Sequence, residues 1–234
     1  MLATHQAQAT AIGALLRADN MSTASAAGLV EAVLECSEQL LEWGDAEAGL
    51  GLVEETLARP ERFDGRQVLR LQCQRLRALS YTHNDHVCLD ETRALLAKYS
   101  ARQSEYFDEY AALRVMEGHV LWHLNRTDEG IPKLLRLREE LLARPESLIL
   151  CRCLVFLSSS YITEGKWDRG REFALEAWIS GRRIGSTYHQ GAALGNLCIA
   201  ERGRCRYAAS ADAATDALAL LEPIGASLRA SHVR

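Results

Sequence analysis

The sequence is poor in proline and lysine and contains no long uncharged apolar run. Only four prolines occur among 234 residues, so little in the chain would interrupt helices. The only lysines are Lys98, Lys133 and Lys166, and the formal net charge is −4. This balance disfavours direct nucleic acid binding by this segment, because such binding needs a cationic surface. No stretch approaches the ~18 apolar residues that span a bilayer, so we expect no membrane contact and a cytoplasmic location.

Motifs for nucleotide, cofactor and disulfide chemistry are also missing. The glycines form no phosphate-binding loop of the G-x-x-x-x-G-K-[ST] or G-x-G-x-x-G type, and we expect no cofactor. The N-terminus lacks the apolar core of a signal peptide. Seven cysteines, an odd number, lie mostly among apolar residues. We expect them to be reduced packing residues rather than a disulfide framework.

The sequence is rich in alanine, leucine, glutamate and arginine, which favour helices. No alternation of apolar and polar residues predicts a strand, so the predicted fold class is all-α. Turn-forming residues recur every 38 to 42 residues, at Gly44, Asn84, Arg126, Gly165 and Gly203. Each turn lies between two stretches of helical periodicity, which predicts about five antiparallel helix hairpins.

These repeats divide the chain into three parts. Residues 1–24 are expected to contain a short amphipathic helix, over 7–17, and a linker. Residues 25–222 are the predicted repeat domain. Residues 223–234 are interpreted as a C-terminal linker or a truncated domain edge.

The fourth hairpin carries the most specific pattern. A small residue precedes an aromatic one by three positions, a Gly-Lys-Trp turn follows, and small residues recur on the second helix: Ser158, Tyr161, Gly165, Trp167, Gly170, Ala174 and Ala177. This pattern resembles the tetratricopeptide repeat. The first hairpin matches it more loosely, at Gly44, Gly49, Val53 and Pro60.

The resemblance implies a right-handed superhelix, an α-α solenoid, that binds a peptide, a protein or an effector on its inner surface. The period near 40 residues exceeds the ~34 usual in the family. Longer hairpins of this kind are similar to the sensor domains of large bacterial regulators. Those regulators include ATP-dependent transcription activators of the maltose-activator type and repeat domains fused to diguanylate cyclases or histidine kinases.

One predicted helix face supplies candidate binding residues. Arg70, Gln74, Arg77 and Tyr81 recur at i, i+4, i+7 and i+11, which places them on one side of a helix, and the last three of them are candidates. The remaining candidates fall on the first helices of later hairpins: His119, His123, Arg152, Ser159, His189, Gln190 and Asn196. First helices line the concave side of such a superhelix, so these residues predict a groove suited to an acidic peptide, a carboxylate or a sugar-like ligand. The alternative is a solvated polar face.

His119 and His123 lie four residues apart on a predicted helix, a spacing that allows both to bind one metal ion. However, Val120 stands where a metalloprotease motif requires glutamate. No third ligand has a suitable spacing. We therefore expect groove or surface histidines and no metal.

Taken together, these patterns predict a non-catalytic interaction or sensor module of a bacterial signalling or transcription regulator, with a protein or peptide partner and an attached output domain. In this hypothesis neighbouring hairpins contact only each other, so a ligand that binds several of them stiffens the array. One alternative is a self-associating scaffold, such as a homodimer. Another is a small helical metal-dependent enzyme that uses the His119/His123 region, with Glu117 as acid or base.

Overall fold

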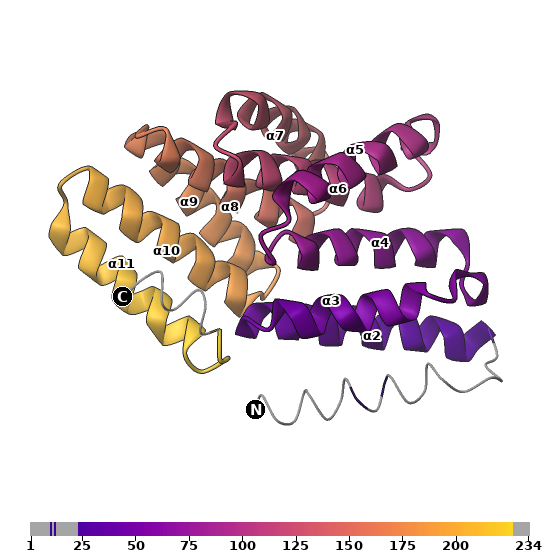
Figure 1. Ribbon diagram of the computed structural model, residues 1–234. Coiled ribbons are helices and arrows are strands. Elements are labelled where there is room, and N and C mark those ends of the chain that lie inside the picture. The colour runs from indigo at the N-terminus through magenta and orange to yellow at the C-terminus, as the bar shows by residue number, and fades with distance from the viewer. Residues whose placement is uncertain (1–9, 11, 13–22, 227–234) are drawn as a thin grey trace.

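The computed structural model describes residues 10, 12 and 23–226, and this range consists of helices without strands (Figure 1). Of the predicted helix over 7–17 it describes only Thr10 and Ile12, and residues 227–234 lie outside it. Within the described range, no helix is both long and apolar enough to cross a membrane. The ten α-helices after residue 22 are α2 (Thr23–Trp43), α3 (Ala46–Leu57), α4 (Gly65–Leu79), α5 (Asp85–Tyr99), α6 (Phe107–His123), α7 (Thr127–Leu142), α8 (Leu148–Thr163), α9 (Trp167–Arg183), α10 (Thr187–Gly203) and α11 (Tyr207–Leu221).

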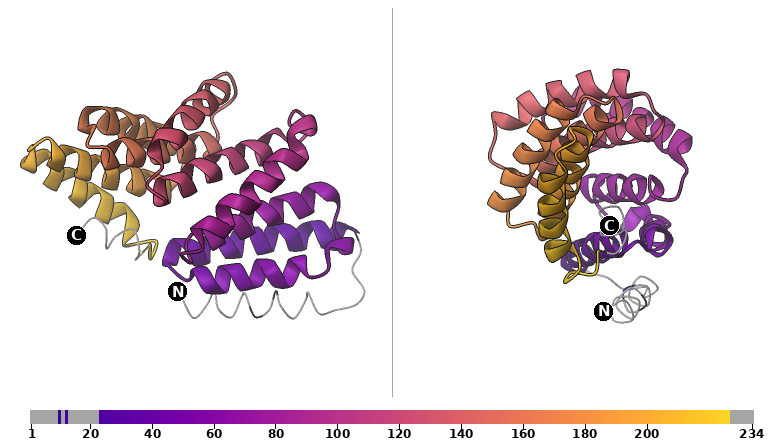
Figure 2. Two further views of the ribbon diagram at one scale, coloured as in Figure 1. Left: turned by 45° about the horizontal axis from the view of Figure 1, so that its top comes forward. Right: turned by 90° about the vertical axis from the view of Figure 1, so that its left-hand side faces the viewer.

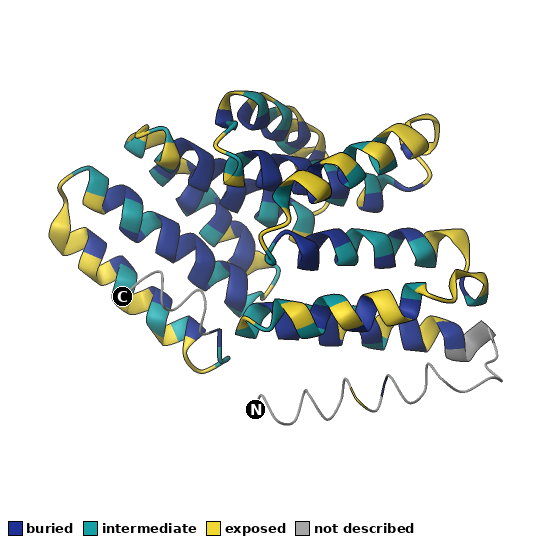
Figure 3. Ribbon diagram, in the orientation of Figure 1, coloured by how far each residue is buried: buried dark blue, intermediate teal, exposed yellow. Residues whose placement is uncertain are grey.

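These helices pair in order into five hairpins, from α2–α3 to α10–α11, and the predicted α-α solenoid is confirmed. The first helices of successive hairpins also contact one another. Figure 2 shows the hairpins winding about a common axis. The first helices from α6 onward are buried on most sides, whereas the second helices expose one face (Figure 3). The first helices therefore form the inner layer of the superhelix, and the second helices form its outer layer.

Every hairpin turn contains one residue with a positive φ angle, between 56° and 89°: Gly44, His83, Asn125, Gly165 and Cys205. The fifth turn therefore lies two residues after the predicted Gly203, which ends α10. Gly203 has a packing role instead. A Cβ atom at this position would lie 2.3 Å from Cδ2 of Trp167, so only glycine lets the tryptophan of the preceding hairpin approach.

The two helices of each hairpin cross at residues 12 positions apart, and nearly all of these residues are small. In the first hairpin Ser37 Oγ donates to the carbonyl oxygen of Gly49 at 3.1 Å. In the fourth, Ser158 Oγ donates to that of Gly170 at 2.8 Å. The five crossing pairs are Ser37/Gly49, Leu76/Cys88, Gly118/Gly130, Ser158/Gly170 and Cys198/Ser210. Small side chains at the crossing allow the backbones to approach, as the tetratricopeptide pattern of the fourth hairpin implies.

The cysteines are free thiols, and all but the exposed Cys205 are buried or partly buried. Cys151 Sγ lies 3.4 Å from the carbonyl oxygen of Ala177, whereas Cys153 Sγ lies 3.4 Å from that of Leu134. These two neighbours in sequence therefore contact different helices and serve packing.

The two ends of the described superhelix meet. The indole Nε1 of Trp43, at the end of α2, donates to the carbonyl oxygen of Ile224 at 2.7 Å. Glu38 of α2 forms an ion pair with Arg152 of α8 at 2.7 Å. The expectation that hairpins contact only their neighbours is therefore wrong. The winding brings the first hairpin against the fourth and against the segment after the fifth.

Candidate ligand-binding groove

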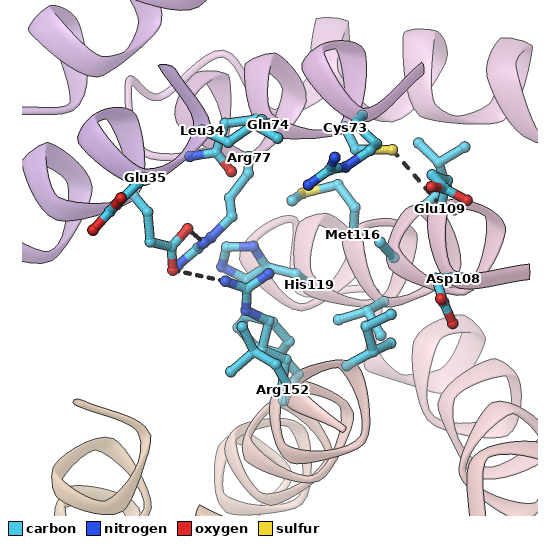
Figure 4. Close-up of a pocket in the computed structure, with 18 of the residues that line it drawn as sticks. Leu34, Glu35, Cys73, Gln74, Arg77, Asp108, Glu109, Met116, His119 and Arg152 are labelled. Carbon is cyan, nitrogen blue, oxygen red and sulfur yellow. Dashed lines mark hydrogen bonds and ion pairs between the residues drawn. The ribbon is translucent and has the colours of Figure 1, made fainter. Parts of the chain in front are cut away.

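A cavity of about 510 Å³, here called the inner groove, lies between α2, α4, α6 and α8 (Figure 4). All four are first helices of their hairpins. Apolar side chains form much of its wall: Leu34, Ala112, Leu113, Val115, Met116, Leu148, Ile149 and Phe156. Most of the other lining residues are charged or polar, a combination typical of ligand-binding cavities.

Five of the ten predicted binding residues line the inner groove: Gln74, Arg77, Tyr81, His119 and Arg152. The first three come from one face of α4 and its end, as their spacing indicates. Gln74 Nε2 donates to Ser37 Oγ of α2 at 3.1 Å, so its amide group is held in place. The binding role of these residues stays a prediction.

Ser159 and Asn196 line a second, smaller cavity of about 310 Å³, whose wall includes Trp122 of α6 and Leu221 of α11. The Asn196 amide group donates to the carbonyl oxygen of Val155 and to Ser159 Oγ, each at 3.0 Å. These two bonds fix the amide at the edge of a mainly apolar space.

The other three predicted residues lie outside both cavities. His123 Nδ1 is 3.0 Å from a carboxylate oxygen of Asp85. The buried His189 is bonded through Nδ1 to Ser186 Oγ at 2.9 Å, at the start of α10. Gln190 packs against the backbone of α9 at Gly181. The structure therefore does not bring these side chains together with the inner groove.

Helix α2 carries an acidic stripe that was not predicted from the sequence. Glu31, Glu35, Glu38 and Glu42 recur at i, i+4, i+7 and i+11, the same spacing as the polar stripe of α4. The first three line the inner groove. This spacing was visible in the sequence and would have predicted one acidic face on the first helix.

Glu38 bridges two guanidinium groups. Its carboxylate forms ion pairs with Arg77 of α4 and with Arg152 of α8, the dashed lines that end on these residues in Figure 4. The side chains of Arg77 and Arg152 are only 9% and 20% exposed, so both charges need a close partner. Arg70 likewise forms two hydrogen bonds with Glu31, one of them 2.8 Å long. All three guanidinium groups of the groove are thus paired with carboxylates of α2.

Burial changes the proton affinity of the groups next to this bridge. It raises the pKa of Glu42 to about 7, although the Arg152 charge acts in the opposite direction. It also lowers the pKa of the Arg152 guanidinium group. Near neutral pH Glu42 is therefore partly protonated, and Glu38 supplies the main negative charge for Arg77 and Arg152.

His119 belongs to an aromatic cluster in the wall of the groove. Its ring stacks on Phe156 with centroids 4.1 Å apart, and the His123 ring lies 4.3 Å away. The His119 side chain is 1% exposed. No group of three or more histidine, cysteine, aspartate or glutamate residues in the described range could hold a metal ion. His119 thus packs against Phe156, and His123 has Asp85 as a polar partner.

The same arrangement of helices occurs in solved structures of other proteins. No protein-family model matches the sequence, and no curated protein matches it either. Bacillus thuringiensis PlcR, in complex with the peptide PapR7 and DNA, matches with a TM-score of 0.76 and 13% identity, over 87% of this chain and 73% of PlcR. BtubC from P. vanneervenii matches with a TM-score of 0.62 and 13% identity, over 94% of this chain and 89% of BtubC.

A Podosopora anserina protein with nearly identical kinesin light chain TPR-like repeats matches with a TM-score of 0.53 and 14% identity, over 85% of this chain and 95% of its own. At these identities the likeness is one of fold. It agrees with the crossing pairs and the repeated turns described above. The chain has a tetratricopeptide-like helical-repeat fold.

Proposed function

We propose that this chain is a non-catalytic binding module of a bacterial regulatory protein and that its ligand is a peptide bound in the inner groove. The observation that carries the proposal is the cavity of about 510 Å³ shared by four first helices. Its volume lies within the ~300–1,000 Å³ typical of ligand pockets. Its wall combines apolar side chains with polar groups held by hydrogen bonds.

The fold supports a peptide rather than another ligand. PlcR, which has the same arrangement of helices, was crystallised with the peptide PapR7. A superhelix places residues of successive hairpins along one inner surface, so an extended chain can contact several hairpins at once. Here α2, α4, α6 and α8 come from four hairpins. A bound peptide would therefore connect elements far apart in the sequence.

The polar groups of the groove serve as structural partners in this proposal. Arg77, Arg152 and Arg70 are engaged by carboxylates, and His119 is enclosed by aromatic rings. Binding rather than catalysis is the role that such a wall supports. The attached output domain and the homodimer stay predictions.

The test is a selection of random dodecapeptides displayed on phage against the purified chain. A matched pair of variants locates the binding site. Ala112→Trp places an indole ring inside the groove, whereas Ala97→Trp places the same ring on the exposed surface of α5. Circular dichroism would verify that both variants are folded.

We expect enriched peptides to bind the wild type and Ala97→Trp equally and to lose at least tenfold in affinity for Ala112→Trp, measured by fluorescence anisotropy. If no peptide is enriched, or if enriched peptides bind Ala112→Trp as tightly as the wild type, the proposed function is wrong.

A further inference from the structure

The inner groove contains more negative than positive side chains. Five carboxylates line it: Glu31, Glu35, Glu38, Asp108 and Glu109. Three guanidinium groups face them: Arg70, Arg77 and Arg152. The polar stripe of α4, considered alone, favours an acidic ligand. The acidic stripe of α2 reverses that charge balance.

Two of these five carboxylates form no ion pair among the described residues. Glu31 pairs with Arg70, and Glu38 pairs with Arg77 and Arg152. Glu109 accepts from Arg66 Nε at 2.7 Å, and only 6% of its side chain is exposed. Among the described residues, Glu35 and Asp108 form no such pair, and both are exposed.

Glu35 and Asp108 lie on opposite sides of the groove, with Arg77, His119 and Met116 between them (Figure 4). Met116 belongs to the apolar wall, together with Leu113 and Ile149. Between the two carboxylates the groove therefore presents the apolar wall and the guanidinium groups that Glu38 already pairs. A ligand that matches it has an apolar middle and a cationic group towards each side.

Binding of an anionic ligand in the groove would be unfavourable. To reach Arg77 or Arg152 it would have to displace Glu38 from a bridge in which both guanidinium groups are largely buried. Removing the partner of a buried charge is strongly unfavourable. A cationic group needs no such exchange, because Glu35 and Asp108 are accessible and unpaired among the described residues.

We propose that the groove binds a peptide in which basic side chains flank an apolar segment, with Glu35 and Asp108 as the two carboxylates that receive them. This inference rests on the proposed function and specifies its ligand. The apolar segment lies on Met116 and its neighbours. The Glu38 bridge stays closed on ligand binding and forms one wall of the site.

The test uses the same random dodecapeptide selection and compares the composition of enriched peptides with that of the unselected library. We expect enrichment of lysine and arginine on both sides of apolar residues. Glu35→Gln and Asp108→Asn should each weaken binding of such a peptide about three- to fivefold, the range of a partly exposed ion pair. Glu139→Gln, at an exposed position of α7, is the control and should leave the affinity unchanged.

A charge exchange identifies the contact. Glu35→Arg should weaken binding of the basic peptide more than Glu35→Gln, and replacing one basic residue of the peptide by aspartate should restore affinity for this variant alone. Affinity for the wild type should fall as salt rises from about 0.05 to 0.5 M, because salt screens exposed charges.

The outcomes separate the two proposals. If enriched peptides depend on the groove but are neutral or acidic, or if Glu35→Gln and Asp108→Asn bind like the wild type, the charge assignment is wrong and the binding function stands. If no groove-dependent peptide appears, the binding function itself is wrong.

Discussion

Gly118 offers a quantitative test of the helix crossings, because a single methyl group can be placed there against a fully buried side chain. Gly118 lies in α6 where that helix crosses α7. A Cβ atom at this position would lie 2.6 Å from Cγ and Cδ2 of Leu134 and 2.8 Å from its Cδ1. Leu134 is 0% exposed and belongs to the main apolar cluster. Because Leu134 is fully buried at this contact, Gly118→Ala should overpack the crossing.

The expected magnitude follows from two opposing effects. Overpacking of a core costs about 1–3 kcal/mol, and three contacts well below van der Waals distance place this site at the upper end. Replacing glycine by alanine within a helix stabilises the helix by about 1 kcal/mol. We therefore expect Gly118→Ala to lower the free energy of unfolding by about 2 kcal/mol.

Gly51 provides the matched control. It lies inside α3, and no heavy atom would come within 4 Å of its added Cβ. Gly51→Ala should therefore show only the helix effect and stabilise the chain by about 1 kcal/mol. The difference between the two variants, about 3 kcal/mol, isolates the overpacking effect.

Urea unfolding followed by far-ultraviolet circular dichroism measures this difference as a shift in the midpoint at constant slope. Gly118→Ala should unfold at lower urea than the wild type, and Gly51→Ala at higher urea. A Gly118→Ala variant as stable as Gly51→Ala would refute the crossing geometry, since the methyl group would then have been accommodated without strain.

Three further predictions follow from side chains described above. Because the raised pKa of Glu42 favours its protonated form in the folded chain, this group stabilises the fold fully below pH 4.5 and loses that effect as the pH rises through about 7. Between pH 5 and 8, Glu42→Gln should therefore raise the free energy of unfolding by about 1–2 kcal/mol relative to the wild type, a range that allows for partial exposure. A stabilisation independent of pH, measured by urea unfolding at several pH values, would contradict this. Trp43→Phe removes the hydrogen bond to Ile224 and should destabilise the chain by about 1 kcal/mol, with faster amide hydrogen exchange at residues 222–226; unchanged exchange there would argue against the contact. Native chain should react with Ellman's reagent rapidly at Cys205 alone, the exposed cysteine, and at all seven cysteines only in denaturant.

The repeat pattern predicted the fold because it depends on local signals. Turn residues and small residues at the crossings act within one hairpin, as Ser158 and Gly170 show. The turns could be located only to within two residues. Three of the five left-handed positions are His83, Asn125 and Cys205, and non-glycine residues give a weaker turn signal than glycine.

The candidate groove was predicted in part, for a reason of curvature. Asn196 was included among the groove residues because it falls on the first helix of a hairpin. The inner groove, however, lies between α2, α4, α6 and α8, and Asn196 of α10 lies in the second cavity together with Ile199.

Long-range partners could not be predicted. Glu38 and Arg152 are 114 positions apart, and their contact depends on how far the superhelix turns over three hairpins. That turn is the sum of small rotations between successive hairpins, and no residue pattern in the sequence predicts these rotations. The charge balance of the groove, which depends on this contact, therefore required the structure.

The bridge between the first and fourth hairpins has a consequence for how the molecule unfolds. A linear array whose units interact only with their neighbours frays from its ends, and its stability is a sum of unit and interface contributions. Glu38 and Trp43 of the first hairpin, however, are held by Arg152 and Ile224. Loss of the first hairpin therefore removes contacts from units distant in sequence. We therefore expect the end of the array to unfold together with its middle, so that the chain unfolds as one cooperative unit rather than as five separable ones.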